Sequence, residues 1–152
     1  MNAIHIRRAT AADRNTLVEY NRAMALETEG KHLDTDVLSA GVAAALADPN
    51  KGFYLVAEIA GEVVGQLMIT TEWSDWRNGW FWWIQSVYVR EDARRQGVFR
   101  VLFQEAERLG RDAGNVVGLR LYVERDNGRA QRTYQSLAMH DAGYRVFEKM
   151  IR

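Results

Sequence analysis

The order of apolar and polar residues predicts a strand and two helices in the first third of the chain. Residues 4–7 alternate with a period of two, which is typical of a strand. Thr10 and Asp13 stand three residues apart, as in a helix-capping signal, and predict a helix that runs to about Leu26. The apolar residues of 35–47 recur on one stripe, so a second helix is expected there.

The middle of the chain predicts three neighbouring strands. Residues 53–59 and 62–71 are rich in β-branched and aromatic residues, and Ala60-Gly61 between them indicates a tight hairpin. Residues 80–90 predict a further strand, which a polar turn joins to the strand before it. The three strands are therefore expected to form two successive hairpins.

The last third alternates helices and strands. Apolar residues recur at helical spacing over 97–112, with charged and polar residues on the other face. Residues 117–124 predict a strand, 127–137 a helix with an Asn at its cap, and 144–151 a last strand. The whole chain of 152 residues is expected to form a single α/β domain, a mixed sheet with helices on its faces.

Composition and charge narrow the class of protein. Hydrophobic residues make up 47% and charged residues 26%, as in an ordinary soluble globular protein. Lys+Arg and Asp+Glu number 20 each, so no overall positive field attracts nucleic acid. The absence of Cys excludes disulfides and fits a cytoplasmic location, and the His residues lack ligand spacing, so no metal site is expected. The apolar stretches fall far short of the ~20 residues that cross a bilayer.

A turn rich in arginine is the clearest candidate for ligand binding. Its sequence is Arg94-Arg95-Gln96-Gly97-Val98-Phe99-Arg100. It leads into the helix expected over 97–112, and a helix start offers N–H groups without intrahelical partners and the positive end of the helix dipole. The turn therefore suits an anion such as a pyrophosphate. On these residues alone, a solvated basic turn is an equal alternative.

Two motifs resemble those of the GNAT superfamily of N-acetyltransferases. Residues 94–99 match [Arg/Gln]-x-x-Gly-x-[Gly/Ala], which lies between the family's fourth strand and third helix, except that Phe99 replaces a small residue. Residues 127–139 are similar to the second signature, Asn-x-x-Ala-x-x-x-Tyr-x-x-Leu-Gly-Phe, with Ala138 and Met139 in place of Gly-Phe. The predicted order of elements is also the family's. The resemblance covers nearly the whole chain and implies a mostly antiparallel sheet with helices on both faces.

The resemblance implies that acetyl-CoA is the cosubstrate and that its acetyl group moves to an amine. The family's backbone contacts to pantetheine fall on Val87 and Val89, and its pyrophosphate contacts fall on 94–100. Tyr134 takes the place of the general acid that protonates the CoA thiolate, although a core tyrosine is the alternative. Asn127 matches the Asn that caps a helix and contacts the cofactor arm.

The acceptor is expected to be the primary amine of a small molecule, such as a polyamine or an amino acid. Acetylation of a protein N-terminus or a lysine side chain is a second hypothesis. A non-catalytic acyl-CoA-binding module is a third, since Phe99 and the lack of a carboxylate in the fourth strand depart from the family pattern. Homodimers are frequent in the family, so a homodimer is expected.

The general base is left open. In the polyamine-acetylating branch of the family this role belongs to a Glu of the fourth strand, and the matching residue here is Gln85, which cannot accept a proton but can orient a water. Four carboxylates are candidates: Glu72 and Asp75 near the second hairpin, and Glu27 and Glu29 in the first interhelix loop. The latter two would also suit a basic substrate. For each of them alone, a solvated surface charge is the simpler interpretation.

Aromatic residues crowd the segment 73–83. Strand alternation divides the strand between two faces, with Phe81, Trp83 and Gln85 on one and Trp80, Trp82 and Ile84 on the other. Trp73 and Trp83 are candidates for an aromatic wall that holds a cationic amine. A sheet buried on both faces, together with a dimer contact, is the alternative.

Overall fold

The computed structural model describes residues 2–152 and divides into two compact units. The larger ends at Tyr122, and the smaller is Val123–Arg152. The strands of the larger unit are β1 (Ile4–Arg8), β2 (Phe53–Ile59), β3 (Glu62–Ser74), β4 (Gly79–Val89) and β5 (Val116–Leu121). Its longer helices are α1 (Arg14–Glu29), α2 (Thr35–Ala47) and α3 (Val98–Ala113).

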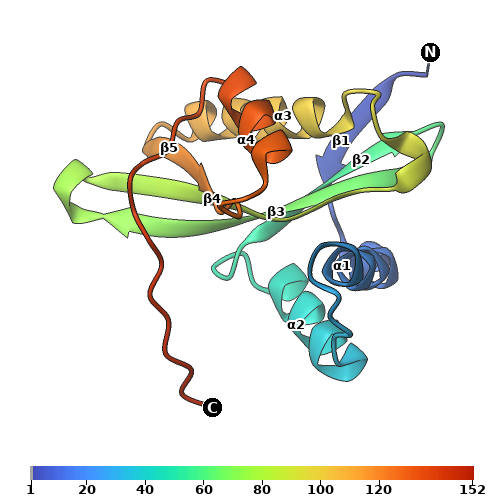
Figure 1. The fold of residues 1–152 in the computed structure, drawn as a ribbon. Coiled ribbons are helices and arrows are strands. Elements are labelled where there is room, and N and C mark those ends of the chain that lie inside the picture. The colour runs from blue at the N-terminus through green and yellow to red at the C-terminus, as the bar shows by residue number, and fades with distance from the viewer. Residues whose placement is uncertain (1) are drawn as a thin grey trace. The chain divides into compact units, whose positions relative to one another are not determined.

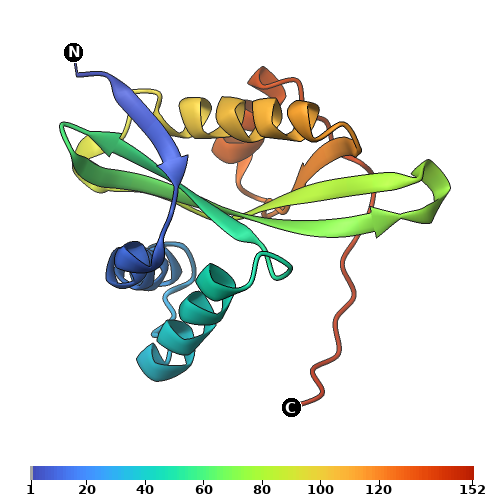
Figure 2. The same ribbon diagram turned by 180° about the vertical axis from the view of Figure 1, so that it is seen from behind.

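The five strands form one mixed sheet in the order β1-β2-β3-β4-β5. The pairs β1–β2, β2–β3 and β3–β4 are antiparallel, and β5 pairs with β4 in parallel. Helices α1 and α2 lie on one face of the sheet and α3 on the other (Figures 1 and 2). The expected fold class, an α/β arrangement with a mostly antiparallel sheet, is confirmed.

Both predicted hairpins are present. Ala60 and Gly61 have φ of 52° and 81°, the left-handed pair that a two-residue turn between twisted strands requires. The second connection, between β3 and β4, contains a short 3₁₀ turn over Asp75–Arg77 and then Asn78 with φ 48°. Asn tolerates this left-handed backbone better than most residues, which explains the turn at that point.

Apolar layers on the two faces of the sheet make the core. Leu17 of α1 and Val42 of α2 pack with Tyr54 and Val56 of β2. Residues on the opposite face meet α3, whose Leu102 and Ala106 are fully buried. Gly65 of β3 allows this close packing, because a Cβ there would lie 2.9 Å from a methyl carbon of Val98.

The smaller unit contains α4 (Gly128–Ser136), preceded by Asn127 as its cap, as the sequence predicts. The expected strand over 144–151 is wrong, because no described residue after Ser136 lies in a helix or strand. Phe147 is 93% exposed and Ile151 96% exposed. A strand is stable only when a neighbouring strand pairs with its backbone, and no strand of residues 2–152 pairs with this segment.

Candidate functional site

The second half of β4 has a neighbouring strand on one side only. β5 pairs with β4 from Trp80 to Ile84, and no described strand pairs with this edge of β4 beyond that point. Arg90 donates its backbone N–H to Val64 of β3 over 2.8 Å. Successive residues of a strand direct their backbone groups to opposite edges, so those of Val89 and Val87 point away from β3. The open edge therefore offers the backbone of the two residues predicted to contact pantetheine.

A bulge in β4 shapes the start of this open edge. Ser86 has φ 53°, and the β3–β4 register shifts between Gln66 and Met68. Gln66 is fully buried, and its Nε2 donates to the carbonyl oxygen of Ser86 over 2.9 Å. Its Oε1 is buried with no hydrogen-bond partner among the described residues. Sequence analysis missed Gln66, although a lone polar residue inside the apolar run 63–69 was a usable signal.

Gly97 is the N-cap of α3, so the last three residues of the arginine-rich turn 94–100 form the first turn of this 16-residue helix. Gly97 has φ 80° and no side chain caps the helix start. A Cβ on Gly97 would meet no heavy atom within 4 Å, so its side is open space. A helix start carries N–H groups that have no intrahelical partners, which is the feature that anion binding uses. The Phe99 ring lies along α3, 6.1 Å from the ring of Phe103, between centroids.

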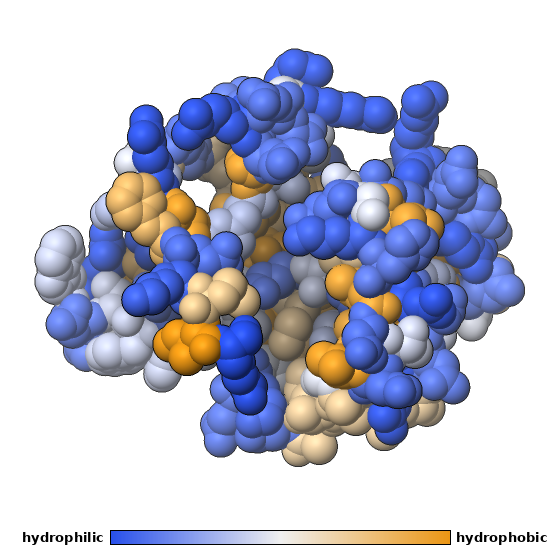
Figure 3. All heavy atoms as spheres, turned by 60° about the horizontal axis from the view of Figure 1, so that its bottom comes forward, coloured by the Kyte–Doolittle hydropathy of each residue, from blue (hydrophilic) through white to orange (hydrophobic). Residues whose placement is uncertain are grey.

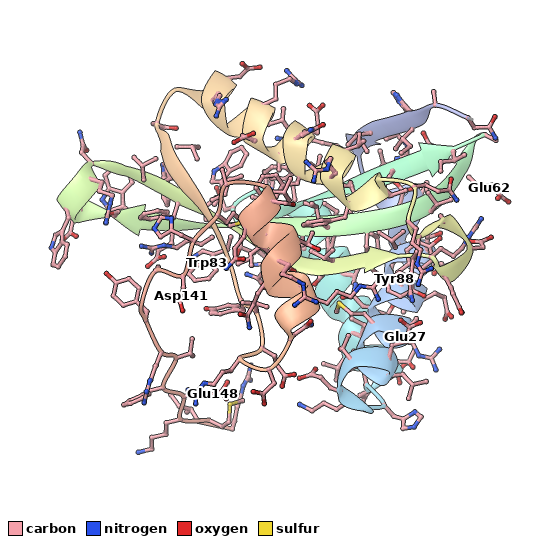
Figure 4. All side chains as sticks on the ribbon, turned by 45° about the horizontal axis from the view of Figure 1, so that its top comes forward. Glu27, Glu62, Trp83, Tyr88, Asp141 and Glu148 are labelled. Carbon is pink, nitrogen blue, oxygen red and sulfur yellow. The ribbon has the colours of Figure 1, made fainter. Side chains whose placement is uncertain are left out.

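Arg94 forms a cluster with Glu27 of α1 and Tyr88 of β4, which we call the Arg94 cluster. Figure 4 shows Glu27 and Tyr88 of this cluster. Its Nη2 lies 2.8 Å from Glu27 Oε2, and its Nε donates to the carbonyl oxygen of Val89 over 2.8 Å. The Tyr88 hydroxyl donates to Glu27 Oε1 over 3.4 Å. Burial, and then the Glu27 charge, raise the pKa of Tyr88. The sequence analysis did not single out Tyr88.

Three residues predicted at or near the acceptor lie in a row on one face of the β3–β4 hairpin. The Gln85 Nε2 donates to Thr70 Oγ1 over 2.5 Å, and the Trp83 Nε1 donates to Glu72 Oε1 over 2.9 Å. Each bond joins residues that are not directly paired across the two strands. Trp83 pairs with Thr70, and Gln85 pairs with Met68. The structure thus brings Gln85, Trp83 and Glu72 together, with Gln85 next to the bulge.

Burial confirms the predicted two faces of β4 from Phe81 onward, whereas Trp80, at a register shift between β4 and β5, is half-buried. Trp82 and Ile84 are 9% and 3% exposed, while Phe81 and Trp83 are half-buried on the other face. The guanidinium of Arg120 lies 3.5 Å from the centre of the Phe81 ring, and its Nη1 lies 3.3 Å from Glu72 Oε1. The protein's own cation therefore occupies the Phe81 ring face, and the Trp83 ring stacks on Tyr122 at 4.5 Å.

The remaining predicted acceptor residues lie outside both groups. Glu29 is exposed at the end of α1, with Lys31 Nζ 3.9 Å from its Oε1. Asp75 accepts the backbone N–H of Trp76 over 2.9 Å inside the hairpin turn. Trp73 is 48% exposed and meets Trp80 edge-on. Of the four candidate carboxylates, Glu27 and Glu72 are therefore the ones that bond to side chains of β4.

In the smaller unit, the predicted cap and the predicted acid are both on α4. Asn127 Oδ1 accepts the backbone N–H of Ala130 over 3.0 Å, which confirms its capping role. Tyr134 is half-buried near the end of the helix. Burial raises the pKa of Tyr134 above its usual value near 10. The phenol therefore stays protonated at neutral pH.

The surface in Figure 3 is mainly hydrophilic, with hydrophobic residues in small separate patches. Within residues 2–152, no group of three or more His, Asp or Glu side chains has an arrangement that could hold a metal ion. None of the helices described has both the length and the apolar composition to cross a membrane.

Comparison with known proteins identifies the family. The sequence model of the acetyltransferase (GNAT) family matches residues 15–139. The crystal structure of a possible acetyltransferase from Clostridium difficile 630 is 48% identical, with 98% of each chain covered and a TM-score of 0.92. No curated protein matches the chain.

Two more distant structures share the fold and were solved with a ligand. An aminoglycoside N-acetyltransferase in complex with CoA is 16% identical over 100% of this chain and 97% of that chain, with a TM-score of 0.77. A predicted acetyltransferase with acetyl-CoA from Clostridium acetobutylicum is 15% identical over 97% and 96%, with a TM-score of 0.78. The family match covers most of the chain, and the chain therefore belongs to the GNAT family of acetyltransferases.

Proposed function

We propose that the protein transfers the acetyl group of acetyl-CoA to the primary amine of a small molecule, such as a polyamine or an amino acid. The observation that carries this proposal is the open edge of β4, near which the turn 94–100 leads into an uncapped helix start. A strand edge can hold an extended amide chain, and a helix start can hold a pyrophosphate. Acetyl-CoA has both parts.

The residues of the larger unit fit this cosubstrate. The backbone of Val87 and the N–H of Val89 are available to the amides of pantetheine, whereas the Val89 carbonyl already accepts a hydrogen bond from Arg94. The pyrophosphate would meet the helix start at Gly97 and Val98, with Arg95, Gln96 and Arg100 adding polar or positive groups. Phe99 replaces a small residue but retains its own backbone N–H, so the substitution removes no N–H group from the helix start.

The reaction that these groups serve is a direct transfer. The neutral amine attacks the thioester carbonyl carbon, a C–N bond forms, the C–S bond breaks, and the sulfur leaves as a thiolate. We propose that Tyr134 gives its proton to that thiolate. A thiol has a pKa of about 8.5, so donation from a tyrosine is uphill by more than about 1.5 units. A thiolate with this pKa leaves readily without protonation, so Tyr134 would assist its departure but not be essential to it.

The acceptor ammonium must lose a proton before it attacks, since an alkyl ammonium has a pKa near 10.4. We propose that Gln85 orients a water beside the bulge and that Glu72, in the same row, accepts the proton through water. Trp83 lies between them and supplies one wall of the acceptor site. Trp73 would extend this wall at the hairpin tip.

A thiol-release assay with acetyl-CoA and a panel of polyamines, amino acids, aminoglycosides and peptides tests the proposal. Turnover with a small amine would support it. Turnover with peptides alone would favour a protein acetyltransferase. Binding of acetyl-CoA without turnover of any amine would favour a non-catalytic acyl-CoA-binding module.

We also propose that the protein is a cytoplasmic homodimer. The lack of Cys supports a reducing compartment. The hairpin tip supports self-association, since Trp76 is 88% exposed, which is unusual for so large a ring. Sedimentation equilibrium of the wild type and Trp76→Ser tests the dimer, which the substitution should weaken. A wild-type monomer would contradict it.

A further inference from the structure

The Arg94 cluster joins three parts of the larger unit that are far apart in sequence. Glu27 comes from the end of α1, Tyr88 from β4, and Arg94 from the turn that follows β4. Figure 4 shows Glu27 and Tyr88 side by side, with Trp83 farther along the sheet. One carboxylate thus connects the helix beside the proposed acceptor face to the turn proposed for the pyrophosphate.

The guanidinium of Arg94 is held at two of its nitrogens. Nε donates to the Val89 carbonyl and Nη2 pairs with Glu27, while the Tyr88 ring lies 5.5 Å below the guanidinium carbon. Nη1 is the nitrogen that neither of these two bonds uses. A side chain fixed in this way has lost its rotamer freedom before a ligand arrives, so binding through Nη1 has a smaller entropic cost.

The Glu27–Arg94 ion pair adds little to folding. The side chains are 42% and 40% exposed, and exposed ion pairs contribute little to stability. Arg94 keeps its bond to Val89 when Glu27 is removed, so substitution of Glu27 should not unfold the protein. The contact is thus better explained by its effect on the orientation of Arg94 than by its contribution to stability.

We propose that Glu27 is a positioning residue for the cosubstrate, acting through Arg94, and not the general base. By holding Nη2, Glu27 directs the remaining nitrogen of Arg94 toward the pyrophosphate arm of acetyl-CoA. This inference rests on the proposed use of acetyl-CoA. It assigns Glu27 an effect on cosubstrate affinity, which neither a solvated surface charge nor a base would have.

Calorimetric titration of CoA into wild type, Glu27→Gln, Glu27→Asp, Arg94→Gln and the double variant Glu27→Gln/Arg94→Gln tests this role. Glu27→Gln should raise the Kd for CoA about 3- to 10-fold, with kcat at saturating acetyl-CoA within about twofold. Glu27→Asp should recover part of the affinity. The double variant should bind no more weakly than Arg94→Gln alone, because Glu27 acts through Arg94.

Glu19→Gln is the matched control, since Glu19 lies on the same helix in an exposed ion pair with Arg22. Its Kd should equal that of the wild type. An unchanged or lower Kd in Glu27→Gln would overturn the inference, as would a tenfold fall in kcat with a shifted pH profile, which would indicate a base. Failure of the wild type itself to bind CoA would instead overturn the proposed function.

Discussion

Trp83 and Glu72 are joined across the β3–β4 hairpin by a hydrogen bond of 2.9 Å from the indole Nε1 to the carboxylate Oε1. Arg120 reaches the same oxygen at 3.3 Å. Two donors on one oxygen restrict the orientation of the carboxylate. The bond thus places a proton acceptor in the row that contains Gln85.

Glu72→Gln should lower kcat about 10- to 100-fold at pH 7 if Glu72 accepts the acceptor's proton. The loss should shrink above pH 9, because the amine then deprotonates in solution. Steady-state kinetics from pH 6 to 10 would measure both effects. Trp83→Phe keeps the carboxylate and an aromatic ring but removes the indole N–H that orients Glu72, so a smaller loss is expected. A kcat unchanged at every pH in Glu72→Gln would remove Glu72 from the mechanism.

Tyr134→Phe should lower kcat severalfold to a thousandfold and leave the affinity for acetyl-CoA nearly intact. The pKa of Tyr134 is raised by burial, so its proton is present throughout neutral pH and is lost only above pH 10. In the wild type, kcat should therefore not fall from ionisation of this phenol below pH 10. Stopped-flow thiol release compared with a binding titration separates the two effects. An unchanged kcat would show that the thiolate leaves without Tyr134.

Asp13→Asn should destabilise the larger unit at neutral pH. Asp13 is 7% exposed and accepts two hydrogen bonds from Arg7, at 2.8 and 2.9 Å, and one from the Thr10 N–H at 2.7 Å. The bonds from Arg7 lower the pKa of Asp13. Loss of the charge should reduce the free energy of unfolding by about 1–2 kcal/mol.

The pH dependence of this effect has a definite sign. Because the folded pKa of Asp13 lies below the unfolded value of about 3.9, its contribution is complete above that value and is lost as the pH falls through the folded pKa. Urea unfolding should show that the difference in free energy of unfolding between wild type and Asp13→Asn is smaller at pH 3 than at pH 7. Asp112→Asn, in an exposed pair with Arg108, should change stability little at either pH. Equal stability of Asp13→Asn and wild type at pH 7 would contradict this account.

Local pattern predicted most of the fold. Hairpin turns and amphipathic helices are set by neighbouring residues, so Ala60-Gly61 and the stripe on α3 were readable from sequence. The last strand failed because alternation over 144–151 indicates a strand without supplying a partner. The bulge at Ser86 was also missed, since pattern does not report the register of two strands.

The candidate site was also predictable only in the features that neighbouring residues determine. The turn at Gly97 and the face shared by Phe81, Trp83 and Gln85 followed from motif and alternation. The bond between Arg94 and Glu27 did not, because it joins residues 67 positions apart through the packing of α1 on the sheet. Likewise, only the structure shows that the Phe81 ring already faces Arg120 rather than open space.

Calorimetric titration of acetyl-CoA into wild type, Gly97→Ala and Gly97→Glu shows whether the start of α3 binds the cosubstrate. A side chain at residue 97 meets no protein atom within 4 Å but must adopt φ 80°, so both variants carry similar backbone strain, about 1–2 kcal/mol, and should fold. Only Gly97→Glu adds a bulky negative charge where the pyrophosphate is proposed. We expect the wild type to bind acetyl-CoA, Gly97→Ala to bind it more weakly and Gly97→Glu not to bind it. Undiminished affinity in Gly97→Glu would contradict the proposed cosubstrate site.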